Sequence, residues 1–251
     1  MSNSDIQTVA GSRAGNFQQE GRTVGGGRGW DWIVEGFALF RKQPGIWILT
    51  TVALGVVFIV ISLIPLLGSL ANALLFPIFG AGLMLGCRDL ERGGALGLEH
   101  LLAGFKRKTG DLVVVGAFNL FGWVVIAFAV FTVIGGGVFM ALMRGGIEGA
   151  SLSIASLLIA LLLVVGLSLP LYMAIWFAPA LIVLHDLAPV AALKESFFAC
   201  LRNWIPFLVY SVVLLVLGIV AAIPAGLGFL ILIPVLIASV YTAYRDIFSA
   251  G

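Results

Sequence analysis

The 251-residue chain is too apolar for an ordinary soluble domain. Apolar residues make up 61% of it and charged residues only 10%, whereas a soluble domain carries about 25% charged residues. Its net charge of +2 is small and unevenly distributed, which argues against a nucleic-acid partner. With only two cysteines, Cys87 and Cys200, we expect free thiols and no disulfide framework. The composition predicts a polytopic integral membrane protein, and with it an all-α fold.

The first 28 residues differ from the rest of the chain. They are rich in Gly, Ser, Asn and Gln and contain few large apolar side chains. Such a segment cannot bury enough surface to offset the entropy lost on ordering. The sequence therefore predicts a disordered cytoplasmic tail over residues 1–28 and one membrane domain over residues 29–248.

Six uncharged apolar runs follow, and each is long enough for a transmembrane helix of ~20 residues. They cover residues 46–67, 69–87, 112–134, 152–176, 204–223 and 226–244. Helices are required because an open strand cannot satisfy its backbone groups in lipid. The third and fourth runs extend to about residues 143 and 184, so we expect tilt, protrusion or kinks, with Pro170 and Pro179 as the kink sites of the fourth.

The basic residues predict the orientation of these spans. Cytoplasmic loops of membrane proteins carry an excess of Lys and Arg. Of the 14 Lys and Arg residues, 13 lie on the side that holds both chain termini, and Arg144 alone lies on the other. We therefore expect both termini in the cytoplasm. The outer side has two short loops and a longer glycine-rich one at residues 135–150.

Three parts of the chain resemble one another. Each even-numbered span ends on a basic residue followed by aspartate, at Arg88-Asp89, His185-Asp186 and Arg245-Asp246. An amphipathic segment precedes each odd-numbered span, with apolar residues spaced as on one helix face. These residues are Trp30, Ile33, Phe37 and Phe40 in the first segment, Leu98, Leu101, Leu102 and Phe105 in the second, and Val190, Leu193, Phe197 and Leu201 in the third. We predict three units, at about 30–92, 97–187 and 188–248. Each is an interfacial helix followed by a transmembrane hairpin, and the units are related by an axis along the membrane normal.

Four stretches carry a resemblance to a known family: WDWIVEGFALFRKQPGIW (30–47), GCRDLERG (86–93), RNWIPFLVY (202–210) and IPAGLGFLILIPVLIASVYTAYRDIF (223–248). Through them the chain resembles, over about residues 29–248, a family of hypothetical proteobacterial inner-membrane proteins. The resemblance implies a multi-pass protein of the bacterial inner membrane and brings no catalytic residues. The helix-plus-hairpin plan is more distantly similar to the membrane region attached to some glycerophosphodiester phosphodiesterases.

Polar residues near the predicted inner surface are the candidate site. The three basic-aspartate pairs could form a ring that binds anionic lipid headgroups or a small anion, or could simply complement helix ends and pair between units. The cluster Lys106-Arg107-Lys108 could hold anionic lipid, or only keep its loop in the cytoplasm. Inside the spans, Asn72 and Asn119 could belong to a transport pathway, although hydrogen bonding between helices is the commoner role.

The chain lacks the sequence signatures of an enzyme. His100 and His185 are its only histidines, and neither has a partner at metal-ligand spacing. No serine lies in a nucleophile elbow, and no phosphate-binding loop is present. We expect no catalytic activity, no metal and no cofactor.

Two functions remain open from the sequence. The favoured hypothesis is a non-catalytic scaffold, assembly factor or lipid-associated protein, with membrane lipids, anionic ones among them, and an unidentified membrane protein as partners. The alternative is a transporter or channel for a neutral or lipophilic solute, because no ionisable residue lies at membrane depth for an ion or proton to use.

Overall fold

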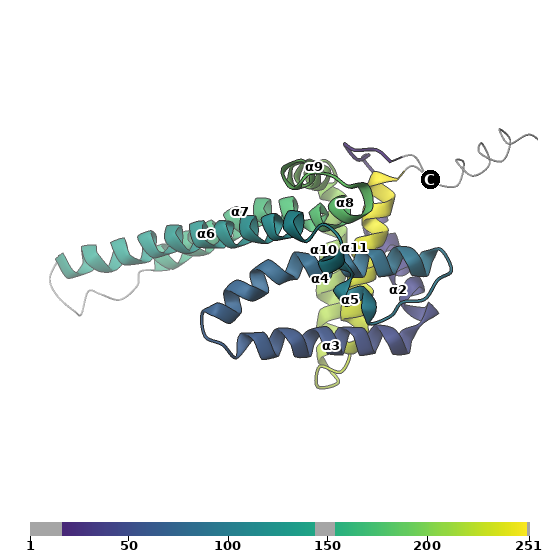
Figure 1. The fold of residues 1–251 in the computed structure, drawn as a ribbon. Helices are drawn as coiled ribbons and strands as arrows, with labels where there is room; N and C mark the ends of the chain where they lie inside the picture. Colours follow the sequence, from purple (N-terminus) through teal and green to yellow (C-terminus); the bar gives the residue numbers. More distant parts are fainter. Residues whose placement is uncertain (1–16, 144–153, 250–251) are drawn as a thin grey trace, which may run out of the picture.

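The structure, a computed structural model, describes residues 17–143 and 154–249. Three shorter amphipathic helices are α2 (Arg28–Lys42), α5 (Glu99–Lys106) and α9 (Pro189–Arg202). The remaining described helices are α3 (Pro44–Ser62), α4 (Leu67–Glu91), α6 (Thr109–Met143), α7 (Ile154–Trp176), α8 (Ala178–His185), α10 (Trp204–Ala222) and α11 (Phe229–Phe248). The α3–α4 and α6–α7 hairpins extend to the same side of the molecule, and α11 runs across the α3–α4 hairpin and contacts both of its helices (Figure 1).

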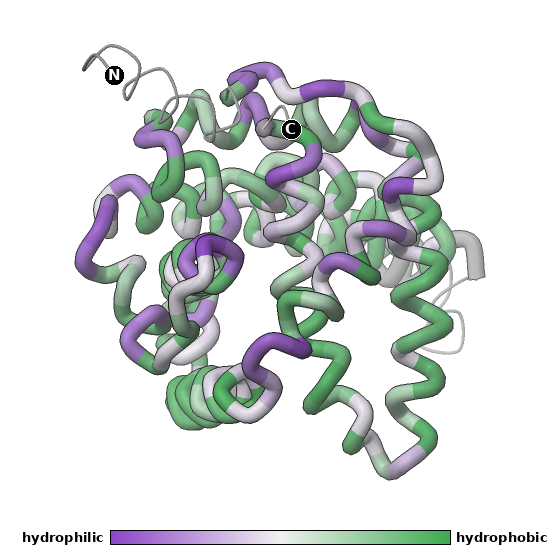
Figure 2. Tube along the Cα trace, turned by 90° about the vertical axis from the view of Figure 1, so that its right-hand side faces the viewer, coloured by the Kyte–Doolittle hydropathy of each residue, from purple (hydrophilic) through white to green (hydrophobic). Residues whose placement is uncertain are grey.

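Six spans within the described residues are long and apolar enough to cross a membrane, and they lie at the six predicted places. The all-α, multi-pass architecture is therefore confirmed. Figure 2 shows long hydrophobic stretches along the hairpins, with hydrophilic residues mainly in the connections and at the helix ends. Spans α4 and α11 are the most buried of the six, so they form the centre of the fold, while α3 and α10 face outward.

The third and fourth spans are long, as predicted. Helix α6 continues to Met143 and so takes up part of the predicted outer loop, whose residues 144–150 lie outside the described part. In the fourth span the helix continues through Pro170 but breaks at Phe177, just before Pro179.

A serine from α9 is inserted at this break. The Oγ atom of Ser196 accepts the Phe177 N–H at 2.9 Å and donates to the Met173 carbonyl at 2.7 Å. In a regular helix the Phe177 N–H would bond the Met173 carbonyl directly. A side chain inserted into that ladder is a known cause of a kink.

Each short amphipathic helix packs against a neighbouring hairpin: α2 on α11 and α10, α5 on α4, and α9 on α7 and α8. The contacts are close because small residues lie at them. A Cβ atom on Gly36 would lie 2.7 Å from the Ser239 nitrogen, and one on Gly104 would lie 2.1 Å from the Ile78 oxygen. Ser196 makes the matching contact from α9. These residues fall in similar tripeptides, Glu35-Gly36-Phe37, Ala103-Gly104-Phe105 and Glu195-Ser196-Phe197.

The apolar stripe predicted on these short helices is partly exposed and partly buried: Ile33 and Phe40 of α2 are only 5% and 6% exposed. Trp30 is 52% exposed and Leu102 is 55% exposed, while Trp32 on the opposite face of α2 is fully buried. The short helices are therefore apolar on two faces. The buried apolar residues pack on a hairpin, and the exposed ones suit a membrane interface.

The prediction of disorder over residues 1–28 is wrong for residues 17–28. The backbone N–H groups of Gln18 and Arg22 donate to the carbonyls of Phe248 and Ile247, both at 2.8 Å. The Val24 N–H donates to Asn203 Oδ1 at 2.8 Å. This segment lacks a core of its own, but it does not need one, because backbone bonds to the last helix order it. Residues 1–16 lie outside the described part.

Candidate functional site

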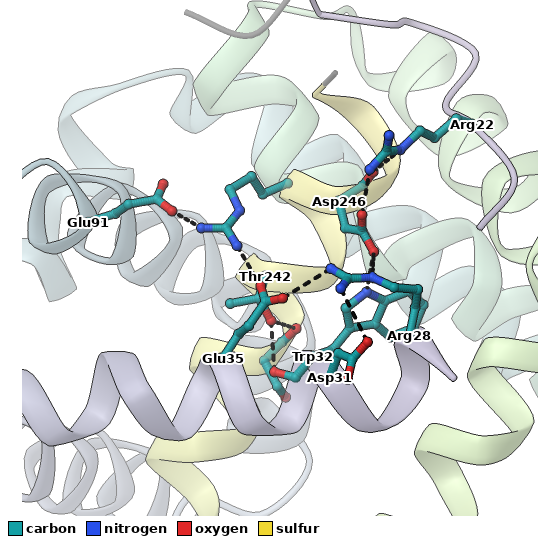
Figure 3. Close-up of polar contacts among 10 residues, drawn as sticks. Arg22, Arg28, Asp31, Trp32, Glu35, Glu91, Thr242 and Asp246 are labelled. Atoms are coloured by element: carbon teal, nitrogen blue, oxygen red, sulfur yellow. Dashed lines mark hydrogen bonds and ion pairs between the residues drawn. The ribbon is translucent and has the colours of Figure 1, made fainter. Parts of the chain in front are cut away.

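A large cluster of polar side chains is centred on Asp246, near the end of α11 (Figure 3). Its carboxylate accepts hydrogen bonds from Arg22 at 2.6 Å, Arg28 at 2.6 Å and Trp32 Nε1 at 2.8 Å. The Asp246 side chain is only 5% exposed, so these bonds replace the water that a buried carboxylate loses. Burial alone would lower the pKa of Arg28, but the hydrogen bond and charge of Asp246, with those of Glu35, raise it. Arg28 therefore stays charged at any physiological pH.

Arg245 extends this cluster to two other helices. Its guanidinium forms ion pairs with Glu35 of α2 and Glu91 of α4. The Tyr241 hydroxyl donates to the second oxygen of Glu91 at 2.7 Å. Arg245 thus ties α2, α4 and α11 together, and its charge is already matched by two carboxylates.

The pair His185-Asp186 has different partners. His185 bonds the Tyr244 hydroxyl and stacks on the Phe17 ring, with centroids 3.6 Å apart. Asp186 lies in the left-handed region with φ +57° and caps α8. Its carboxylate lies 3.3 Å from Lys108 Nζ.

The third pair, Arg88-Asp89, lies in a surface hollow between α4 and α5 of about 290 Å³. We call it the α4–α5 hollow; it is lined by Leu85, Arg88, Asp89, Glu99, His100, Ala103, Lys106 and Arg107. Arg88 Nε approaches Asp89 at 3.6 Å, too far for a hydrogen bond, and that buried atom has no other hydrogen-bond partner among the described residues. Asp89 also faces His100 at 3.3 Å.

The three basic-aspartate pairs therefore do not have equivalent surroundings. Asp246 and Arg245 are paired with other charged groups, and His185 contacts aromatic side chains. In the hollow, by contrast, Lys106 and Arg107 have no ion pair to a described residue. Sequence inspection missed Arg22, Arg28, Trp32, Glu35 and Glu91, which form most of the Asp246 and Arg245 contacts. Two acidic residues on segments that flank membrane spans, Glu35 and Glu91, were the available signal, since each needs a cation.

The two candidate asparagines inside the spans differ from one another. Asn72 Nδ2 donates to Ser62 Oγ at 2.8 Å, which links α4 to α3 as expected for an interhelical polar residue, while its buried Oδ1 has no hydrogen-bond partner among the described residues. Asn119 lines an apolar cavity, and its buried Oδ1 has no hydrogen-bond partner among the described residues.

Both cysteines are free, as predicted, and the structure shows that both are buried. Burial raises the pKa of Cys200, so its thiol is protonated and a weak nucleophile. Among the residues that the structure describes, no three His, Cys, Asp or Glu side chains are grouped to hold a metal ion.

Comparison with known proteins identifies a relative. A protein of Burkholderia thailandensis, named a probable inner membrane protein, is 31% identical over 245 residues, which is 88% of this chain and 90% of that protein. The chain belongs to this family of inner membrane proteins. As a family member it is a multi-pass protein of the inner membrane, in agreement with its six apolar spans. No family model and no solved structure matches it. Nothing found supports the distant similarity to glycerophosphodiester phosphodiesterases.

Proposed function

We propose that the protein is a non-catalytic, lipid-associated component of the inner membrane that binds an anionic lipid headgroup at the α4–α5 hollow. In this proposal both termini are cytoplasmic and the three predicted units are related by a pseudo-threefold axis. The observation that carries it is the distribution of paired and unpaired basic groups.

Most basic groups near the basic-aspartate pairs already have carboxylate partners. Those with an ion pair to another element are Arg22, Arg28, Lys108 and Arg245. In the hollow, by contrast, Lys106 and Arg107 have no ion pair to any described residue, and Arg88 has only its long approach to Asp89. Other basic residues without an ion pair to a described residue, such as Arg41, Arg92 and Arg202, lie outside the hollow, but the hollow brings Lys106 and Arg107 together with Arg88 at one concave surface.

The expected affinity is modest. Three basic residues line the hollow, each worth about 1 kcal/mol against an anionic membrane surface. Asp89 and Glu99 line it too and offset part of this attraction. Binding should therefore weaken with salt, because exposed charges are screened within ~10 Å at 0.1 M.

Matching contacts support the three-unit arrangement. Gln43, at the end of α2, accepts the Leu96 N–H ahead of α5 at 2.9 Å. Asn203, at the end of α9, accepts the Val24 N–H ahead of α2 at 2.8 Å. Each of these side chains fixes the segment that leads into another unit's short helix, and the second contact joins the last unit to the first.

The test is lipid analysis of protein purified from bacterial membranes in mild detergent. The triple variant Arg88→Gln, Lys106→Gln, Arg107→Gln should retain less anionic phospholipid than the wild type. Lys194→Gln is the matched control, because Lys194 has no ion pair to a described residue and lies outside the hollow. Equal anionic lipid in the triple variant and the control would rule out the headgroup site.

Transport of a neutral or lipophilic solute is the second candidate. The observation that favours it is the apolar cavity with the unpaired Asn119 amide. Purified protein in liposomes should then move such a solute, and Asn119→Leu should reduce the flux without unfolding the protein. Unaltered flux in this variant would exclude the cavity as the pathway.

A further inference from the structure

The apolar cavity lies where the three hairpins meet. Its volume is about 220 Å³, and its walls come from α3, α4, α6, α7, α8 and α11. Residues at the same distance before the three basic-aspartate pairs line it together. Phe79, Trp176 and Leu236 lie nine positions before the basic residue, and Leu83, Ala180 and Val240 lie five positions before it. The cavity is therefore a shared central feature of the three hairpins.

The size and lining of the cavity suit an apolar occupant. An engineered apolar cavity of about 150 Å³ stays free of water and binds benzene, and this one is larger and lies among spans whose solvent is lipid. A ligand pocket for a complete drug-sized molecule is usually about 300–1,000 Å³. The cavity thus fits a section of an elongated lipophilic molecule.

Polar groups at the wall of the cavity indicate which functional group its occupant carries. The Asn119 amide has an unpaired oxygen, and a flip of the amide would present its N–H₂ group instead. Tyr172 lines the same wall. An occupant that carries a neutral hydrogen-bonding group can satisfy the Asn119 amide, whereas a plain hydrocarbon chain cannot.

We propose that this cavity binds an elongated lipophilic molecule with one neutral oxygen function, such as a hydroxyl or carbonyl, which hydrogen-bonds Asn119. No formal charge faces the site from any element that lines it, so a charged headgroup does not belong there. The site is separate from the α4–α5 hollow, and the two proposals can fail independently.

Gly80 offers a way to fill the cavity without disturbing the fold. It lines the wall, and a Cβ atom there would meet nothing within 4 Å. Gly80→Phe should therefore occupy the space that the ligand needs. Gly218 on α10 is the matched control, because it is equally open but does not line the cavity.

The experiment is photolabelling of the full-length protein in nanodiscs with two probes, a long-chain alcohol and the matching hydrocarbon, each bearing a diazirine. Mass spectrometry of the labelled peptides should find the alcohol on wall residues such as Met84 and Leu236. Gly80→Phe should abolish this labelling, and Gly218→Phe should leave it unchanged. Asn119→Leu should reduce alcohol labelling about fivefold, the effect of one lost hydrogen bond of about 1 kcal/mol, and leave the hydrocarbon unaffected.

Three results would overturn the proposal. Labelling confined to the outer faces of the hairpins would mean that the cavity is not a binding site. Equal wall labelling by the two probes would mean that ordinary lipid chains fill it. Unchanged labelling in Gly80→Phe, with the unfolding temperature of the variant preserved, would place the label elsewhere. The triple variant of the α4–α5 hollow should label as the wild type does, which separates this proposal from the headgroup site.

Discussion

The carboxylate of Asp246 lies 2.6 Å from the guanidinium of Arg28, although 218 positions separate the two residues in the chain. The same carboxylate accepts a hydrogen bond from Arg22, so α11 is bound to the segment that precedes α2. The Asp246 carboxylate is only 5% exposed, and two guanidinium groups and one indole N–H surround it. It is therefore a buried charge whose stability depends on these partners.

Asp246→Asn should therefore destabilise the protein. Removing one partner of a buried pair costs about 3–5 kcal/mol, and we expect the lower end because both arginines are partly exposed. The loss of stability can be measured by thermal unfolding in detergent, with tryptophan fluorescence as the signal. Asp31→Asn is the control, since Asp31 is 46% exposed and pairs only with Arg28. A loss no larger than in that control would show that the Asp246 contacts do not hold the fold together.

Gly104→Ala should destabilise the contact between α5 and α4. The added Cβ would lie 2.1 Å from the backbone oxygen of Ile78, so a helix must move. Overpacking of this kind costs about 1–3 kcal/mol. Gly45→Ala, where a Cβ meets nothing within 4 Å, should leave stability equal or slightly raised in the same assay. Equal unfolding temperatures for the two variants would show that α5 does not pack on α4 as closely as described.

Ser196→Ala should destabilise the break between α7 and α8. The Phe177 N–H and Met173 carbonyl both lose their partner, at a cost of about 1–3 kcal/mol. Amide hydrogen exchange at Phe177 should become faster. Ser211→Ala is the comparison, because its hydroxyl only bonds a carbonyl of its own helix. Unchanged exchange at Phe177 would mean that the helix closes directly without the serine.

The positions of the spans could be predicted from the sequence, but the contacts between them could not. Hydropathy located all six spans, because length and apolar character are local properties. The Asp246 cluster could not be predicted, since nothing in the local sequence indicates that Arg22 meets a helix more than 200 positions away. Composition likewise misled over residues 17–28, whose order comes from hydrogen bonds to α11 rather than from a core of their own. The small residues Gly36, Gly104 and Ser196 recur in similar tripeptides and could have identified the packed face of the short helices.

The orientation can be tested with thiol labelling in intact cells. Cys87 and Cys200 are buried, so a membrane-impermeant maleimide should label neither in the native protein. Leu227→Cys, at an exposed position of the α10–α11 connection, should label from outside the inner membrane. Arg107→Cys should label only after the membrane is opened. The reverse pattern would overturn the proposed cytoplasmic location of both termini.

The most direct test of the central claim is native mass spectrometry of the protein titrated with equal amounts of phosphatidylglycerol and phosphatidylcholine. The wild type and Lys194→Gln should retain phosphatidylglycerol preferentially, and Arg88→Gln, Lys106→Gln, Arg107→Gln should lose that preference. A wild type that binds both lipids equally, or a triple variant that keeps the preference, would contradict a headgroup site in the α4–α5 hollow.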